Sequence, residues 1–258
     1  RPSAVISQSP RQPQSHPVVG TPGTPVAAAT RLLYLTNPLL TSTPESRRHE
    51  FAVRRRDNVR AVTKGPAVAG GSMNFPLSAD EILEWMLIGM AGGVTPTPTG
   101  SGQLWEFTPS EDLDSATLQV HDGAAAWRSA GVRVNQMTIA GSANGENLVT
   151  LDLYGLDRTL IALNPAAGTL TERTPAFYEG WETSMYIDDF GDVPGTTAIP
   201  GVLINWNIVF MNNLGRKYTA QNTNAQRSTP VGKIGVEATL TFEAIEAVTQ
   251  AEVANWDG

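Results

Sequence analysis

The 258-residue sequence contains no cysteine and only three histidines, His16, His49 and His121, which lie far apart in the chain. Disulfide bonds, cysteine-ligated metal sites and thiol chemistry are therefore excluded, and a histidine-rich metal site is not expected. The longest nearly uncharged apolar stretch, residues 85–94, is much shorter than the roughly 20 residues that a membrane-spanning helix needs. These absences predict a protein with no metal, no cofactor and no membrane segment.

Acidic residues are also absent from the first 44 positions, where eight of the 18 prolines occur. A proline-rich, weakly apolar segment favours extended backbone and cannot bury a core of its own. The sequence therefore predicts an extended N-terminal arm over residues 1–30, which either projects into solvent or lies along a neighbour. The remaining residues, 31–258, are predicted to form a single domain.

The charge is unevenly distributed along the chain. Residues 1–64 carry ten basic side chains against three acidic ones, a formal charge of +7, whereas the remainder carries 8 against 22, a formal charge of −14. Residues 41–72 are predicted to form a long basic loop or hairpin. The candidates there for contact with an acidic surface are Arg47, Arg48, Arg54, Arg55 and Arg56. The surface could belong to the same chain, to a copy or to another partner, and the alternative is a solvated charged edge.

One helix is predicted over residues 78–90. Ser78 and Glu81 have the spacing of a capping box, which satisfies free backbone amides at a helix start. Ile82, Trp85 and Met86 then recur at helical spacing and form an apolar stripe. The helix should therefore pack against a sheet. A second capping box predicts a short terminal helix over residues 249–256.

Alternating apolar and polar residues predict strands in the rest of the chain. The predicted strands are residues 116–121, 132–140, 148–154, 183–188, 202–211 and 236–245. A change of phase near Asn135 and Gln136 predicts a β-bulge, and residues 132–140 and 148–154 should form a hairpin. The buried faces of the last two strands should be Val202, Ile204, Trp206, Ile208 and Phe210, and Val236, Ala238, Leu240 and Phe242. The expected fold is mainly β, an antiparallel β-sandwich or barrel flanked by one α-helix.

No pattern of catalytic residues emerges from the sequence. It contains neither a phosphate-binding glycine loop nor a Gly-x-Ser-x-Gly elbow. The acidic run of residues 188–192 fits a turn better than a calcium loop. A glycosidase that used Glu179, Glu182, Asp188 and Asp189 stays open as an alternative, although nothing positive selects these residues. The protein is therefore predicted not to be an enzyme.

Several ordered segments resemble the tail tube proteins of long-tailed bacteriophages, over most of the chain beyond about residue 18. They are GTPGTPV (20–26), GGSMNF (70–75), AGVRVNQMTIAG (130–141), YEGWE (178–182), YIDD (186–189), WNIVFMN (206–212) and VEATLTF (236–242). The resemblance implies a structural virion protein with a tail-tube β-sandwich. It also implies hexameric rings that stack into a hollow tube, through which the genomic DNA passes without specific binding. The implied partners are further copies of the chain, the tape-measure protein, and the tail terminator and distal tail proteins. The implied location is the virion tail, with assembly in the host bacterial cytoplasm.

Within this interpretation, the five arginines named above are expected to make contacts between rings. The lumen-facing candidates are Asn135, Asp152, Asn205 and Asn207, which alternate with apolar neighbours on the predicted strands. An acidic or neutral lumen would let DNA slide, because phosphates bind lysine and arginine strongly. The alternative to a tail tube protein is a monomeric β-sandwich binding module, either carbohydrate-binding or adhesin-like.

Overall fold

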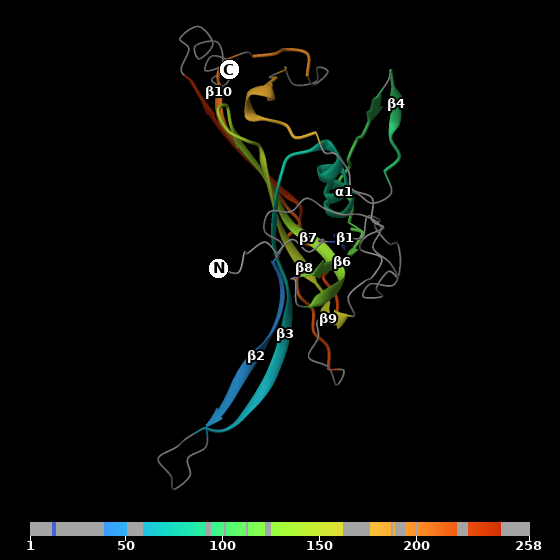
Figure 1. Cartoon of the computed structure of the whole chain (residues 1–258), viewed down its shortest axis with the longest axis vertical. Coiled ribbons are helices and arrows are strands. Elements are labelled where there is room, and N and C mark those ends of the chain that lie inside the picture. Colours follow the sequence, from blue (N-terminus) through green and yellow to red (C-terminus); the bar gives the residue numbers. More distant parts are fainter. Residues whose placement is uncertain are drawn as a thin grey trace, which may run out of the picture.

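The computed structural model describes residues 12–13, 39–50, 59–90, 94–100, 102–111, 113–121, 125–161, 176–186, 188, 195–199, 201–220 and 227–243. These residues form antiparallel strands, one α-helix and one turn of 3-10 helix (Figure 1). The strands are β1 (Gln12–Pro13), β2 (Leu39–Glu50), β3 (Val59–Pro76), β4 (Thr97–Thr99), β5 (Gly102–Leu104), β6 (Ala116–His121), β7 (Ala126–Ser142), β8 (Leu148–Gly155), β9 (Asp157–Ile161), β10 (Leu203–Met211) and β11 (Gly235–Phe242). The helix α1 is Ala79–Gly89, and the 3-10 turn η3 is Gly180–Glu182. The predicted mainly β fold with one helix is confirmed.

Strand β7 takes part in both halves of a curled nine-stranded sheet. Its first half pairs with β6 and β9, and its second half pairs with β8 and β10. The second half is the centre of a six-stranded antiparallel sheet in the order β11-β10-β7-β8-β3-β2. Between the two halves, Gly131 has a φ of +60°, a left-handed conformation that glycine adopts without steric cost. Gly131 is therefore the corner at which the strand passes from one half of the sheet to the other.

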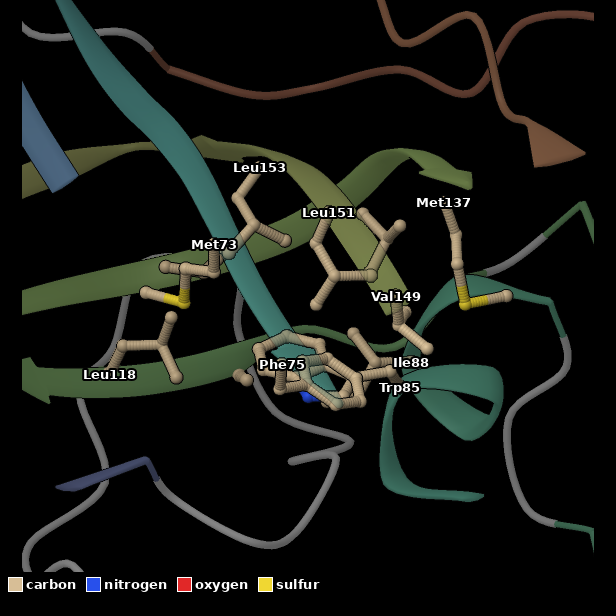
Figure 2. Close-up of a cluster of buried hydrophobic side chains, with 12 residues drawn as sticks. Met73, Phe75, Trp85, Ile88, Leu118, Met137, Val149, Leu151 and Leu153 are labelled. Atoms are coloured by element: carbon tan, nitrogen blue, oxygen red, sulfur yellow. The ribbon is translucent and has the colours of Figure 1, made fainter. Parts of the chain in front are cut away.

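Helix α1 covers one face of the six-stranded sheet, and the core lies between them. Ser78 Oγ accepts a hydrogen bond from the Glu81 backbone N at 3.4 Å, as expected for an N-cap. Trp85 and Ile88 of the helix point toward Phe75 of β3 (Figure 2). The other buried members of the cluster are Met73, Ala116, Leu118, Val132, Val134, Met137, Val149, Leu151 and Leu153. The predicted helix and its packing against a sheet are thus confirmed.

The predicted bulge and hairpin are also confirmed. The pairing of β7 with β8 shifts register between Val134 and Gln136, so that Asn135 is the extra residue. The strand predicted at residues 183–188 is wrong. There, Tyr186 makes only an isolated bridge with Ala198, and the Asp188 carboxylate accepts hydrogen bonds from residues 195–197. A side chain that bonds to nearby backbone in this way stabilises a loop in place of a strand ladder.

Alternation along β10 and β11 predicts the two faces of these strands but not what covers them. Trp206 is buried and pairs with Leu240, so both lie on the face that carries the core. Leu240 is nevertheless exposed, as are Ile204, Val236, Ala238 and Phe242. These five residues were expected to be buried, and that expectation is wrong. Among the described elements, α1 packs on β7, toward the middle of the sheet, and no element covers the β11 end.

Strands β2 and β3 form a long hairpin that extends beyond the rest of the sheet (Figure 1). Strand β8 pairs with β3 only from Ala69 to Pro76, so the preceding part of β3 has β2 as its single partner among the described strands. This two-stranded projection, residues 43–50 and 59–68, is called the basic arm below. The predicted basic residues Arg54, Arg55 and Arg56 lie outside the described residues, as does the terminal helix predicted at 249–256. Of the predicted N-terminal arm, Gln12 and Pro13 pair with β6.

Candidate assembly surfaces

The six-stranded sheet has a polar face opposite the helix. The pairing registers place the polar side chains of alternate positions together on this side. They are Ser72, Asn74, Gln136, Thr138, Thr150, Asp152, Asn205, Asn207, Glu237, Thr239 and Thr241. Two of them are acidic and none is basic. This set is called the polar face.

The four lumen-facing candidates all belong to this side of the sheet. Asn135 donates a hydrogen bond from Nδ2 to Oδ2 of Asp152 at 2.7 Å, while Asn205 and Asn207 are exposed on β10. Asn135 Oδ1 also accepts a hydrogen bond from the Leu214 backbone N at 2.9 Å. The sequence did not reveal this structural role of Asn135, because residue 214 is distant in the chain.

Two arginines lie at the end of the polar face toward the basic arm. Arg133 Nη1 donates to the Thr229 carbonyl oxygen at 2.9 Å. The Arg216 guanidinium lies over the Tyr154 ring, 3.9 Å from its centroid, in a cation–π contact. Both cations are therefore engaged by neighbouring groups of the same chain.

Most residues of the basic arm whose burial is described are exposed, and its two faces differ. On one face, Arg47 Nη2 lies 3.3 Å from Glu45 Oε2, and His49 Nε2 lies 2.8 Å from Thr63 Oγ1. On the other face, Arg48 is paired with Val62 in the strand register, and Lys64 follows on the same side. Val62 is 60% exposed. Thus Arg47 and Arg48, both predicted contact residues, lie on opposite faces of the arm.

An aromatic–acidic patch lies at the other end of the sheet, next to the turn between β7 and β8. It consists of Phe177, Tyr178, Trp181, Glu146, Glu179 and Glu182, all exposed. Trp181 has the largest exposure among the exposed large hydrophobic side chains, at 74%. Sequence reasoning did not select this patch as a contact surface. The sequence signal that could have indicated this surface is the segment YEGWE (178–182), which places two aromatic and two acidic residues around a glycine.

Backbone and side-chain bonds fix this patch to the sheet. The Tyr178 backbone N donates to the Leu77 carbonyl at 2.9 Å, and the Gly180 N donates to the Gly145 carbonyl at 2.8 Å. The buried Asn147 donates from Nδ2 to Tyr178 O, Glu179 O and Thr183 Oγ1, each at 3.2 Å. Glu182 Oε2 accepts from the Glu179 N at 2.9 Å. Trp181 is therefore presented on a well-anchored turn.

The Asp188 carboxylate organises a loop. Oδ1 accepts hydrogen bonds from Thr196 Oγ1 and Thr197 N, both at 2.7 Å, and Oδ2 accepts from Gly195 N at 2.6 Å. The hydrogen bond from the Thr196 hydroxyl, followed by those from the two amides, holds the pKa of Asp188 well below its usual value. Asp189 lies outside the described residues. Over the described part of the chain, no group of three or more His, Asp and Glu side chains could hold a metal ion.

Within the described ranges, no helix has the length and apolar character needed to cross a lipid bilayer. A comparison with curated proteins finds no match. The sequence model of one family, described as phage tail tube protein, matches residues 17–255. A structural family of this kind points to a non-enzymatic role. Because the match covers nearly the whole chain, this protein belongs to the phage tail tube protein family and is a structural component of the phage tail.

Proposed function

We propose that six copies of this tail protein close into a ring and that the rings stack into the hollow tube that conducts phage DNA during ejection. The observation that carries the proposal is the six-stranded sheet, which combines a polar face with two edge strands that each have a single partner among the described strands. Membership of the tail tube family supports the same conclusion. The sheet supplies a wall, and its edges supply the contacts that join one wall to the next.

The sheet edges support ring closure. Among the described strands, β11 pairs only with β10, and β2 pairs only with β3. Exposed edges have free amide and carbonyl groups that readily pair with another chain. On β11 the edge is accompanied by the exposed apolar residues Val236, Leu240 and Phe242. A neighbouring copy that covered these side chains would make a heterologous contact, and such contacts form a ring when the rotation closes.

The polar face supports the lumen assignment of Asn135, Asp152, Asn205 and Asn207. Its side chains are mostly neutral, and its two charged members, Asp152 and Glu237, repel phosphate. Release of condensed counterions by lysine and arginine dominates nonspecific DNA binding, so a surface without them has little affinity for the duplex. DNA would therefore slide along this wall.

Stacking requires a second heterologous contact, directed along the tube. The basic arm, with Arg47 and Arg48 and with Arg54, Arg55 and Arg56 between its strands, is the proposed contact between rings. An isolated two-stranded hairpin is only marginally stable in water, so docking would stabilise the arm.

The tape-measure, tail terminator and distal tail proteins are the further partners that we propose. Assembly would take place in the host bacterial cytoplasm.

Negative-stain electron microscopy of the concentrated protein, paired with light scattering, tests this proposal. We expect a monomer or a hexamer in solution and sixfold rings or tubes in the images. A tail-tip extract should be added if the purified protein does not assemble alone. A protein that stays monomeric even then would contradict the proposal and favour a monomeric β-sandwich binding module.

A further inference from the structure

The basic arm and the aromatic–acidic patch lie at opposite ends of one strand. Pro76, at the end of β3, pairs with Leu148, and the next residue, Leu77, accepts the hydrogen bond from Tyr178 in the patch. The start of β3 at Val59 lies at the far end of the arm. Seventeen residue steps of about 3.3 Å separate Val59 from Pro76, so the strand extends roughly 56 Å. Figure 1 shows the arm at the lower end of the molecule and η3, in gold, at the upper end.

The two surfaces have opposite charge. The exposed face of the arm presents Arg48 and Lys64 on either side of the exposed Val62, and neither cation has a carboxylate partner among the described residues. The opposite arm face is partly neutralised by the bond between Arg47 and Glu45. The patch presents three carboxylates and no cation. In it, Glu146 and Glu179 face each other across an isolated β-bridge.

Both surfaces also expose apolar side chains that have nothing to cover them in the described chain. Val62 is 60% exposed on the arm, and Trp181 is 74% exposed on the patch. Tryptophan and arginine are the residues that most often dominate the energy of protein interfaces, especially where a rigid backbone presents them. An arginine over an aromatic ring adds a cation–π attraction.

We propose that the arm face formed by Arg48, Val62 and Lys64 docks on the aromatic–acidic patch of a second copy of this chain. In the stacked tube, that copy belongs to the next ring. This inference rests on the proposed function and adds the receptor surface for the arm. Trp181 and Tyr178 would cover Val62 and stack on Arg48. Glu146 and Glu179 would face Arg48 and Lys64.

The same chain cannot satisfy the contact by folding back. The arm residue Val62 and the patch are separated by 14 steps of a continuous strand, about 46 Å. The arm of each copy can therefore bind only the patch of another copy. Since arm and patch point in opposite directions, the contact repeats head to tail and produces an open filament.

Because the chain has no cysteine, cross-linking at introduced cysteines tests the contact without background. Ser46→Cys places a thiol on the docking face of the arm, and Ser184→Cys places one beside the patch, both at exposed positions. Tubes of the Ser46→Cys/Ser184→Cys variant, treated with a short bis-maleimide, should give a ladder of covalent multimers in a denaturing gel. The matched control is Ser46→Cys/Gln103→Cys, whose second thiol lies at an exposed position on β5, outside the patch and the polar face, and it should remain monomeric.

The outcomes separate the contact from the proposed function. Tubes that form in both variants but cross-link equally would overturn the inference and leave the tube intact. Wild-type protein that never forms rings or tubes would contradict the proposed function itself.

A charge swap gives a second, independent test that does not depend on linker geometry. Glu146→Lys/Glu179→Lys should raise the concentration needed for tube formation by about tenfold or more, because like charges would then face each other. Arg48→Glu/Lys64→Glu should do the same, and the quadruple variant should recover assembly. Lys217→Glu, an exposed charge elsewhere, is the control and should assemble normally. If the quadruple variant folds but assembles no better than either double variant, the inference is wrong.

Discussion

Asn135 and Asp152 are joined across β7 and β8 by a 2.7 Å hydrogen bond at the point where β7 carries its extra residue. The same asparagine accepts the Leu214 amide and, through its backbone carbonyl, the Asn212 amide. One side chain thus links the bulge, the neighbouring strand and the segment after β10. A position selected as a polar wall residue is also part of the structural framework of the sheet.

This arrangement predicts that Asn135→Ala destabilises the monomer. The variant loses two side-chain hydrogen bonds and leaves the partly buried Leu214 amide without its acceptor. We expect the free energy of unfolding to fall by about 1–3 kcal/mol. Chemical denaturation monitored by circular dichroism measures this change. Asn205→Ala, on the exposed part of the same face, is the control and should change stability by less than about 0.5 kcal/mol. Equal stability of the two variants would contradict the assigned role.

Gly180→Ala is predicted to detach the turn that presents Trp181. A Cβ at position 180 would overlap the backbone carbonyl oxygens of Ser142 and Gly145. Neither carbonyl can move without disturbing the turn between β7 and β8, so we expect a loss of about 2 kcal/mol or more. Faster hydrogen exchange at residues 180–183 would locate the damage. Gly102→Ala, whose Cβ would have its nearest neighbour at 3.7 Å, should leave both stability and exchange unchanged.

The loop around Asp188 is predicted to open in acid. The pKa of Asp188 is lowered in the folded protein from its usual value of 3.8, so the carboxylate stabilises the fold above that pH. This contribution declines as the pH falls below 3.8 toward the folded pKa. The Gly195 and Thr197 amides should therefore be protected from hydrogen exchange at pH 6, relative to their intrinsic exchange rates. They should lose this protection in strong acid. Asp188→Asn should lose much of this protection already at neutral pH, and unchanged protection would disprove the role of the charge.

The exposed apolar side chains of β11 are predicted to serve assembly more than folding. Val236 and Leu240 are 56% and 40% exposed, so Val236→Ser/Leu240→Ser removes less buried surface from the monomer than a substitution in the core would. We expect the unfolding free energy to fall by about 1–2 kcal/mol, which leaves the monomer folded, and ring formation to weaken strongly. Light scattering and electron microscopy measure assembly. Thr239→Ser, on the opposite face of the same strand, should form rings normally. A double variant that also assembles normally would exclude this stripe from the ring contact.

Positive charge on the polar face is predicted to hold DNA. Asn205→Lys/Asn207→Lys places two cations among the polar-face residues named above, none of which is basic. Tubes of this variant should retain double-stranded DNA at low salt and release it as the salt concentration rises, because each phosphate contact displaces counterions. Wild-type tubes should retain little. Gln103→Lys on β5 adds a cation at an exposed position outside the polar face and serves as the control. Equal retention by the control would contradict the lumen assignment.

Much of this fold follows from local sequence patterns. The capping residue Ser78 and the apolar stripe around Trp85 predict α1, because both signals lie within one short segment. The change of phase at Asn135 predicts the bulge for the same reason. These features depend on hydrogen bonds and packing between residues that are close in the chain or on adjacent strands.

The burial of side chains and the pairing of distant segments could not be predicted from local sequence patterns. Alternation assigns Leu240 to the apolar face of β11, but only the position of α1 determines whether that face is covered. Likewise, nothing near Gln12 indicates that it pairs with β6, and nothing near Trp181 indicates that Asn147 fixes its turn. The aromatic–acidic patch depends on such long-range contacts, so the sequence suggested the basic surface of the proposed contact but not the acidic one.

In the proposed stack of rings, the continuous run of β3 from the arm to the patch would make the hairpin a spacer between successive rings. Adding two residues to both β2 and β3 would lengthen the spacer by about 7 Å and keep every arm side chain on its present face. Adding one residue would instead turn Arg48 and Val62 away from their receptor. The axial repeat of the proposed tube would therefore change during evolution by two residues of this hairpin at a time, unless the docking face were rebuilt as well.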